Sequence, residues 1–174
     1  MLFFNKLQKY RVLIISLLFI GVIALVTKQI AHSGYRLTYS TTLSMPKGFY
    51  LIKPFASLKH GDIVEFYPPV AIRDFLKQKH WAPRSGLLLK HVYGIPEDFV
   101  CTQNNFIFIN GAKIAPIYKF YAPGKKLPQI SLCRKLNQDE YFLLSTTISN
   151  SFDSRYFGPV SRKDIVGEAS FLFR

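Results

Sequence analysis

The sequence is poor in residues that bind metal ions. Only two of its 174 residues are cysteines, Cys101 and Cys133, and neither belongs to a Cys-x-x-Cys pair. The four histidines are scattered, so we expect no structural zinc site. In an exported chain two such cysteines would form a disulfide, whereas in a cytosolic chain they would stay buried thiols. The compartment of the protein therefore decides between these two states.

Acidic residues are also scarce. The chain has 10 Asp and Glu against 23 Lys and Arg, which gives a net charge of +13. Such a charge suits either nucleic acid or an anionic lipid bilayer. The positive residues form no run longer than a pair, and no recognition helix or zinc finger accompanies them. We therefore expect a lipid bilayer, and not nucleic acid, as the partner of this charge.

The composition excludes a disordered chain. Hydrophobic residues make up 49% of the sequence and aromatic residues 16%, with 16 Phe and 10 Tyr. This aromatic content favours β-structure, and the length suits one globular domain. The sequence contains no internal repeat and no low-complexity tract.

One long apolar run stands near the N-terminus. From Val12 to Thr27 the chain has sixteen residues without a charge. As a helix this run spans about 24 Å, and flanking residues up to 31 extend it towards the thickness of a bilayer. The basic residues Lys6, Lys9 and Arg11 precede it, which places the N-terminus in the cytoplasm. The alternative is a cleavable signal peptide, but the residues that follow offer no clear small-x-small cleavage site.

Behind this run the sequence predicts mainly antiparallel strands and one short helix. The Asn110-Gly111 pair is the clearest turn signal, because it supplies the positive φ angles of a type I′ hairpin. Residues 70–80 suit a helix in which Val70, Phe75 and Leu76 share a face. Residues 32–43 are interpreted as a juxtamembrane stretch. Strands are expected at 49–53, 62–67, 87–93, 106–109, 113–118 and 141–144, with one or two more in 164–173.

Three short segments carry candidate chemistry. Ser44 is followed by Met-Pro, and the residue before a proline avoids the helical region, so the serine lies in extended or turn geometry. Lys90 follows three leucines. If it points the same way as Leu88, the ammonium faces an apolar interior, which would lower its pKa. The third segment, 150–160, is rich in hydroxyls and contains an Asp-x-Arg pair.

Each segment also has a plainer interpretation. Ser44 is then an ordinary turn serine, and Lys90 lies on the exposed face of a half-buried strand. The third segment is then a loop held by an ion pair between Asp153 and Arg155. A Ser–His–Asp triad is conceivable with four histidines, but none has a recognisable local frame.

Taken together and in order, these segments resemble the type I signal peptidases, which are serine–lysine proteases. The resemblance is greatest to the conjugative-transfer (TraF-type) branch, which processes pilin precursors. It runs from the apolar helix to the C-terminus, and the paired Cys101 and Cys133 also resemble that branch. The motifs are Ser-Met-Pro-Lys-Gly-Phe-Tyr from Ser44, Gly-Asp-Ile-Val from Gly61, Leu89-Lys90 followed by Gly-Ile-Pro, Ile-Asn-Gly from Ile109, and Phe-Asp-Ser-Arg-Tyr-Phe-Gly-Pro-Val from Phe152.

The resemblance implies a role for each matching residue. Ser44 is the expected nucleophile and Lys90 the general base. The main-chain N–H of Ser44 and the hydroxyl of Thr42 would stabilise the oxyanion, and Ser151 would orient the lysine ammonium. Asp153 and Arg155 are expected to be mainly structural, and the transfer branch would add a further role for Asp153. No metal or other cofactor is implied, and Cys101 and Cys133 are expected to form a disulfide.

One departure from the family pattern refines this expectation. General signal peptidases carry Gly-Asp-Asn-Arg before the third motif, whereas this chain has Ser145-Thr-Thr-Ile. The difference favours the conjugation branch over a housekeeping enzyme. The substrate implied is an exported precursor, a pilin precursor in particular, processed by hydrolysis or by cyclisation of the product.

The resulting prediction is an antiparallel, signal-peptidase-like (LexA-like) β-domain behind one transmembrane helix. Residues 1–11 would be cytoplasmic, 12–31 would anchor the chain in the bacterial inner membrane, and 32–174 would form a periplasmic serine peptidase. The rival interpretation is a pilus-assembly scaffold that keeps the fold without activity. That rival predicts a defect in one of the three segments, and the sequence shows none.

Overall fold

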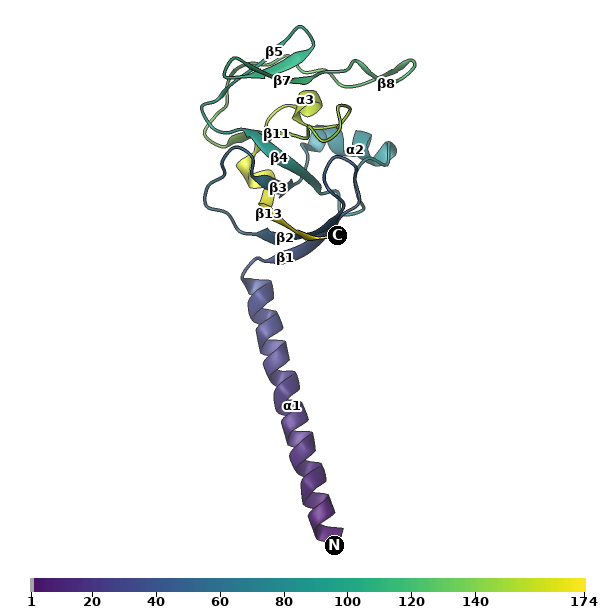
Figure 1. The fold of residues 1–174 in the computed structure, drawn as a ribbon, viewed down its shortest axis with the longest axis vertical. Coiled ribbons are helices and arrows are strands. Elements are labelled where there is room, and N and C mark those ends of the chain that lie inside the picture. The colour runs from purple at the N-terminus through teal and green to yellow at the C-terminus, as the bar shows by residue number, and fades with distance from the viewer. Residues whose placement is uncertain (1) are drawn as a thin grey trace. The chain divides into compact units, whose positions relative to one another are not determined.

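The computed structural model describes residues 2–174, and the side chains of residues 1–9, 30 and 31 lie outside the description. The chain divides into two units, residues 1–36 and 37–174 (Figure 1). The first consists mainly of helix α1 (Leu2–His32), which extends beyond the predicted anchor 12–31 at its N-terminal end. Its segment Tyr10–Gln29 has a mean hydropathy of 2.4 and is long enough to cross a bilayer. Lys6 and Lys9, which underlie the predicted orientation, lie outside the described side chains.

The second unit is built on a seven-stranded sheet. The order of its strands is β1-β2-β13-β3-β4-β11-β12, and β2, β13, β3, β4, β11 and β12 pair antiparallel. The last strand of the chain thus lies between two early ones, β2 and β3. The bounds are β1 Arg36–Ser40, β2 Gly48–Lys53, β3 Ile63–Phe66, β4 Leu88–Gly94, β11 Glu140–Leu144, β12 Val160–Ser161 and β13 Ile165–Phe173.

A smaller sheet of order β10-β5-β6-β7 lies at the other end of this unit (Figure 1). Its strands are β5 Phe99–Gln103, β6 Phe106–Ile109, β7 Ala112–Pro116 and β10 Cys133–Lys135. The predicted β6–β7 hairpin is confirmed, and both of its turn residues, Asn110 and Gly111, have positive φ angles. A two-stranded hairpin, β8 (Phe120–Ala122) and β9 (Lys125–Lys126), projects from the segment that follows β7 (Figure 1).

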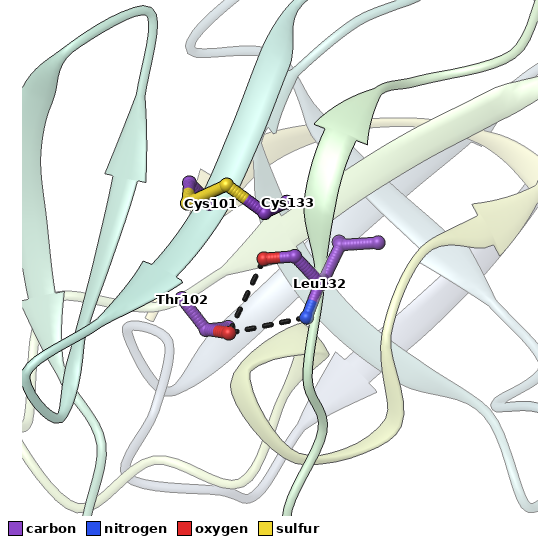
Figure 2. The surroundings of a disulfide bond; sticks show 4 residues. All are labelled: Cys101, Thr102, Leu132 and Cys133. Atoms are coloured by element: carbon purple, nitrogen blue, oxygen red, sulfur yellow. Dashed lines mark hydrogen bonds between the residues drawn. A yellow bond between two sulfur atoms is a disulfide. The ribbon is translucent and has the colours of Figure 1, made fainter.

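The predicted disulfide is present in the small sheet. Cys101 on β5 stands directly opposite Cys133 on β10, and their sulfur atoms are bonded (Figure 2). Next to it, the hydroxyl of Thr102 donates to the carbonyl of Leu132 and accepts from the Leu132 N–H (Figure 2). The bond therefore fastens an edge strand that has only three paired positions.

Strand β11 separates two apolar cores. Successive side chains of a strand point to opposite faces. Leu143 packs with Val64 and Leu76 in one core, while Phe142 and Leu144 pack with the residues of the small sheet in the other. All of β11 except Glu140 is buried for this reason. The predicted strand at 141–144 is therefore confirmed, and it joins the two halves of the domain.

The helices of this unit are short. Helix α2 (Val70–Gln78) buries Ile72 and Leu76, which are four residues apart and so lie on one face. The expected place of Val70 on that face is wrong, because its side chain is 75% exposed. The other helices are α3 (Ser154–Phe157) and the 3-10 turn η1 (Arg162–Asp164). The segment 150–160, a loop in the plainer interpretation, thus contains a short helix, and the one or two strands expected in 164–173 are a single strand, β13 (Ile165–Phe173).

Candidate active site

Ser44 lies in a turn between β1 and β2, and the residues that follow it hold this turn in place. Met45, its neighbour, is buried in a third apolar cluster with Tyr50 and Ile52. The hydroxyl of Tyr50 donates to the carbonyl of Pro46 at 2.9 Å. Only glycine fits at Gly48, because its φ is +150° and an added Cβ would lie 2.5 Å from a main-chain oxygen of Phe173. The residues after Ser44 thus fix the turn that presents its hydroxyl.

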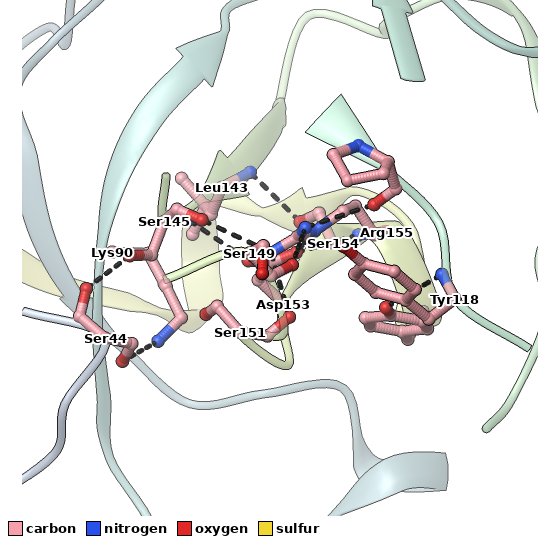
Figure 3. A network of polar contacts seen from close by, with 12 residues as sticks. Ser44, Lys90, Tyr118, Leu143, Ser145, Ser149, Ser151, Asp153, Ser154 and Arg155 are labelled. Carbon is pink, nitrogen blue, oxygen red and sulfur yellow. Dashed lines mark hydrogen bonds and ion pairs between the residues drawn. The ribbon is translucent and has the colours of Figure 1, made fainter. Parts of the chain in front are cut away.

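Lys90 extends from the middle of β4 into the same site. It shares a face of the strand with Leu88, and its side chain is only 3% exposed. Its Nζ lies 2.6 Å from the Oγ of Ser44 (Figure 3). The sequence pattern left a buried and an exposed placement of Lys90 open, and the structure has the buried one.

The surroundings of Lys90 favour the neutral amine. Burial lowers the pKa of Lys90 from its ordinary 10.5 to about 8. The negative charge of Asp153 acts in the opposite direction, and the positive charge of Arg155 lowers the pKa a little further. The net result is an amine that can take up a proton near neutral pH.

Thr42 stands on the approach to Ser44. Its Oγ1 lies 3.3 Å from the Oγ of Ser44, and either hydroxyl can be the donor. The threonine hydroxyl therefore lies next to that of Ser44, and its expected contact with an oxyanion stays a prediction.

Asp153 and Arg155 form a fully buried ion pair behind the site. The Nε and Nη2 of Arg155 each donate to a carboxylate oxygen of Asp153 at 2.8 Å (Figure 3). The same carboxylate caps α3, since it accepts from the Arg155 N–H at 3.3 Å. The remaining donors of the guanidinium go to main-chain carbonyls, those of Ser149, Ser151, Ser145 and Pro116. The pair therefore fixes the course of the loop 145–151.

Ser145 connects this pair to the nucleophile, a contact that the sequence did not predict. Its hydroxyl donates to the main-chain carbonyl of Ser44 (Figure 3). Its N–H donates to Asp153 at 3.1 Å and its carbonyl accepts from Arg155 at 3.2 Å. The one signal of this contact in the sequence is the departure at Ser145-Thr-Thr-Ile, where general signal peptidases carry Gly-Asp-Asn-Arg.

Ser151 lies in the wall of the site but makes no contact of the predicted kind. Its side chain is 2% exposed, and its Oγ has no hydrogen-bond partner among residues 2–174. Figure 3 shows it between the Ser44–Lys90 pair and the Asp153–Arg155 pair. Its role in orienting Lys90 stays a prediction.

The site opens into a cavity of about 650 Å³. Ser44, Lys90, Thr42 and Ser151 line it together. No cluster of three or more His, Cys, Asp or Glu side chains that could hold a metal ion occurs in the described part of the chain. The arrangement places a hydroxyl beside a buried amine in a cleft that can admit a peptide. A hydroxyl as nucleophile and an amine as base are the groups that an acyl-transfer reaction requires.

Comparison with known proteins agrees with this chemistry. Residues 9–174 match the family described as signal peptidase, peptidase S26. Two Escherichia coli proteins named plasmid transfer protein TraF are 32% and 31% identical, over 83% and 73% of this chain and 86% and 77% of their own lengths.

Other similar proteins are named signal peptidase I. A probable signal peptidase I-2 of Synechocystis is 29% identical over 66% of this chain, which spans 48% of that relative. A solved signal peptidase I from Enterococcus faecalis V583 aligns with 67% of this chain and 99% of its own, at 21% identity and a TM-score of 0.39.

Proposed function

Because the chain belongs to the signal peptidase family, peptidase S26, and is a serine endopeptidase, we propose that Ser44 is its nucleophile and Lys90 its general base. The observation that carries this proposal is the 2.6 Å separation between Lys90 Nζ and Ser44 Oγ in a buried site. A serine hydroxyl becomes an effective nucleophile only when a base removes its proton. The lowered pKa of Lys90, about 8, supplies such a base.

The reaction would proceed in two halves. Ser44 Oγ attacks the scissile carbonyl while neutral Lys90 takes its proton, and the resulting ammonium then protonates the leaving amine. The Ser44 N–H and the Thr42 hydroxyl stabilise the oxyanion. Water then attacks the acyl-enzyme with Lys90 again as base, and Ser44 is released. Ser151 orients the amine of Lys90 through these steps, while Asp153 and Arg155 hold the loop behind it.

We propose further that the substrate is a precursor exported during conjugative plasmid transfer, a pilin precursor in particular. This rests on the similarity to the two plasmid transfer proteins and on the Ser145-Thr-Thr-Ile sequence. The precursor would enter the cleft as an added strand. If the amino terminus of the same peptide replaces water in the second half, the product is a cyclic pilin.

The apolar helix and the family fit a single-pass membrane protein. We propose that residues 1–11 lie in the cytoplasm and that 32–174 fold in the periplasm of a bacterial inner membrane. The disulfide between Cys101 and Cys133 supports an oxidising location for the domain. Labelling of intact cells with a membrane-impermeant amine reagent would reach lysines of the domain if this orientation holds.

The test mixes the detergent-solubilised full chain with a pilin precursor from the same source and follows products by mass spectrometry. We expect cleavage by the wild type and none by Ser44→Ala or Lys90→Ala. Ser131→Ala and Lys163→Ala, which change the same residue types at exposed positions, are the matched controls. Cleavage by purified Ser44→Ala would refute the mechanism. A product lighter by one water than the linear peptide would establish cyclisation.

A further inference from the structure

The cavity that holds Ser44 and Lys90 continues along an aromatic wall. Trp81, Tyr118, Phe120, Tyr121 and Phe152 all line it. Trp81 is central to this wall, because its ring centroid lies 5.0 Å from that of Tyr121 and 5.5 Å from that of Phe152. These residues come from three separate parts of the chain. The cavity is therefore built to take a bulky apolar side chain in addition to the scissile bond.

The β8–β9 hairpin adds positive charge to the rim of the aromatic wall. Phe120 of the wall pairs directly with Lys126 on β9, and directly opposed residues of two antiparallel strands share a face. Lys125 pairs with Ala122 on the same hairpin, Lys119 directly precedes Phe120 in the chain, and both are exposed. From the α2 side, Lys79 places its Nζ 5.4 Å from the centre of the Tyr121 ring. We call Lys79, Lys119, Lys125 and Lys126 the basic rim.

Nothing in the neighbouring sequence neutralises the basic rim. The segments 75–96 and 99–138 contain no Asp or Glu. Within residues 2–174, no lysine of the rim forms an ion pair with a carboxylate. Like charges held together without counter-charges attract an anionic partner and raise its rate of encounter.

We propose that this cleft selects precursors that carry an acidic side chain next to a bulky apolar one close to the cleaved bond. The apolar side chain packs against Trp81, and the carboxylate lies among the lysines of the basic rim. The inference rests on the proposed peptidase function for its biological meaning, but the binding itself does not depend on cleavage. A peptide is favoured over a lipid headgroup because the rim borders the cavity that contains the nucleophile.

The protein contains its own reporter for this site. Trp81 is the only tryptophan of the chain, so tryptophan fluorescence reports events at the aromatic wall alone. The full-length Ser44→Ala protein in detergent would be titrated with short peptides that lack tryptophan and carry alanines around the cleavage site. A Phe-Asp pair, or a matched Phe-Asn pair, is moved stepwise along the peptide in both directions from that site.

At one position we expect the Asp peptide to bind roughly three to ten times more tightly than the Asn peptide, since exposed ion pairs contribute little each. The preference should fade at high salt because solvent screens exposed charges. The charge-reversed variant Lys125→Glu/Lys126→Glu should instead bind the Asn peptide more tightly than the Asp peptide. The control Lys59→Glu/Lys163→Glu carries the same net charge at exposed sites elsewhere and should leave the preference intact.

The outcomes separate the inference from the proposed function. An equal affinity for Asp and Asn peptides at every position, or no fluorescence change with any peptide, overturns the inference. The inference is also overturned if Lys125→Glu/Lys126→Glu loses binding to vesicles of anionic lipid but keeps the preference for the Asp peptide. In that case the basic rim would bind the membrane and not the precursor. Failure of the wild type to cleave any of these peptides counts against the proposed function only.

Discussion

The pH dependence of cleavage is expected to follow the titration of Lys90. Only the neutral amine accepts the proton of Ser44, and burial lowers the pKa of Lys90 to about 8. At pH 7 such a lysine is neutral in roughly one molecule in ten, whereas the ordinary pKa of 10.5 gives about one in 3,000. The low-pH limb of kcat/KM should therefore rise about tenfold per pH unit up to pH 7 and level off above pH 8 to 9.

A variant tests whether burial is the cause. Leu88 lines the cavity on the same face of β4 as Lys90, so Leu88→Ser would admit water beside the amine. We expect the limb of this variant to move to higher pH, towards 10.5. Leu172→Ser, a change of the same kind at an exposed position, is the control. The assay is the initial rate of cleavage of a quenched fluorescent peptide from about pH 6 to about pH 10, at constant ionic strength.

Two results would refute this reasoning. A limb more than about one pH unit below 8 would mean that a group other than Lys90 acts as the base. A limb that stays near pH 8 in Leu88→Ser would mean that desolvation by this leucine does not set the pKa of the base.

Four further predictions concern stability and positioning. Lys90→Met should abolish cleavage and raise the free energy of unfolding by about 1 to 3 kcal/mol at pH 7, because it removes a buried ammonium. Between about pH 8 and 10.5 Lys90 is protonated in the unfolded chain but neutral in the native one. The free energy of unfolding of the wild type therefore rises with pH in that window, and the advantage of Lys90→Met shrinks. Urea unfolding at several pH values would measure both changes. Ser145→Ala should lower kcat about fivefold with little change in KM, since a lost hydrogen bond of about 1 kcal/mol loosens the Ser44 carbonyl; an unchanged kcat would contradict this. Arg155→Leu leaves Asp153 buried and unpaired, so thermal unfolding should report a loss of about 3 to 5 kcal/mol, and a native-like Tm would argue against the pair. Cys101→Ala/Cys133→Ala should cost about 2 to 4 kcal/mol of stability while activity at low temperature persists, and two free thiols in the wild type by non-reducing mass spectrometry would contradict the disulfide.

Much of the framework was predictable from local signals. The Asn110-Gly111 pair fixed one hairpin, and alternating or continuous apolar runs located β2, β3, β4 and β11 to within about one residue. The leucines before Lys90 and the two-residue period of a strand made its burial one of two possible placements, and the structure has that one. These features depend on residues that are close together in the chain.

The remaining features depend on partners that are distant in the chain. Strand β1 carries no alternation of buried and exposed residues, and it lies within residues 32–43, for which the sequence predicts only a juxtamembrane stretch. Strand β10 has three exposed residues and exists because it pairs with β5 and its disulfide. The contact between Ser145 and Ser44 joins residues 101 positions apart. No local pattern encodes such pairings. The motifs therefore predicted which residues take part in the chemistry, but not the distant contacts that hold them in place.

The cleft was hidden from the sequence for the same reason. Trp81 follows α2, Tyr121 lies on the β8–β9 hairpin, and Phe152 precedes α3. Each residue alone is one aromatic among many. Only the packing of the two apolar cores around β11 brings the three rings into one wall.

The Cys101–Cys133 bond also alters the covalent topology of the molecule. It closes a ring of backbone over a sequence separation of 32, and this ring carries β6, β7 and the whole β8–β9 hairpin. A protease that cuts the exposed hairpin breaks the chain without separating the pieces, because the sulfur atoms still join them. Such a nick would be invisible on a gel until a reducing agent is added. The β8–β9 hairpin can thus be cut, labelled or lengthened while the disulfide still joins β5 to β10.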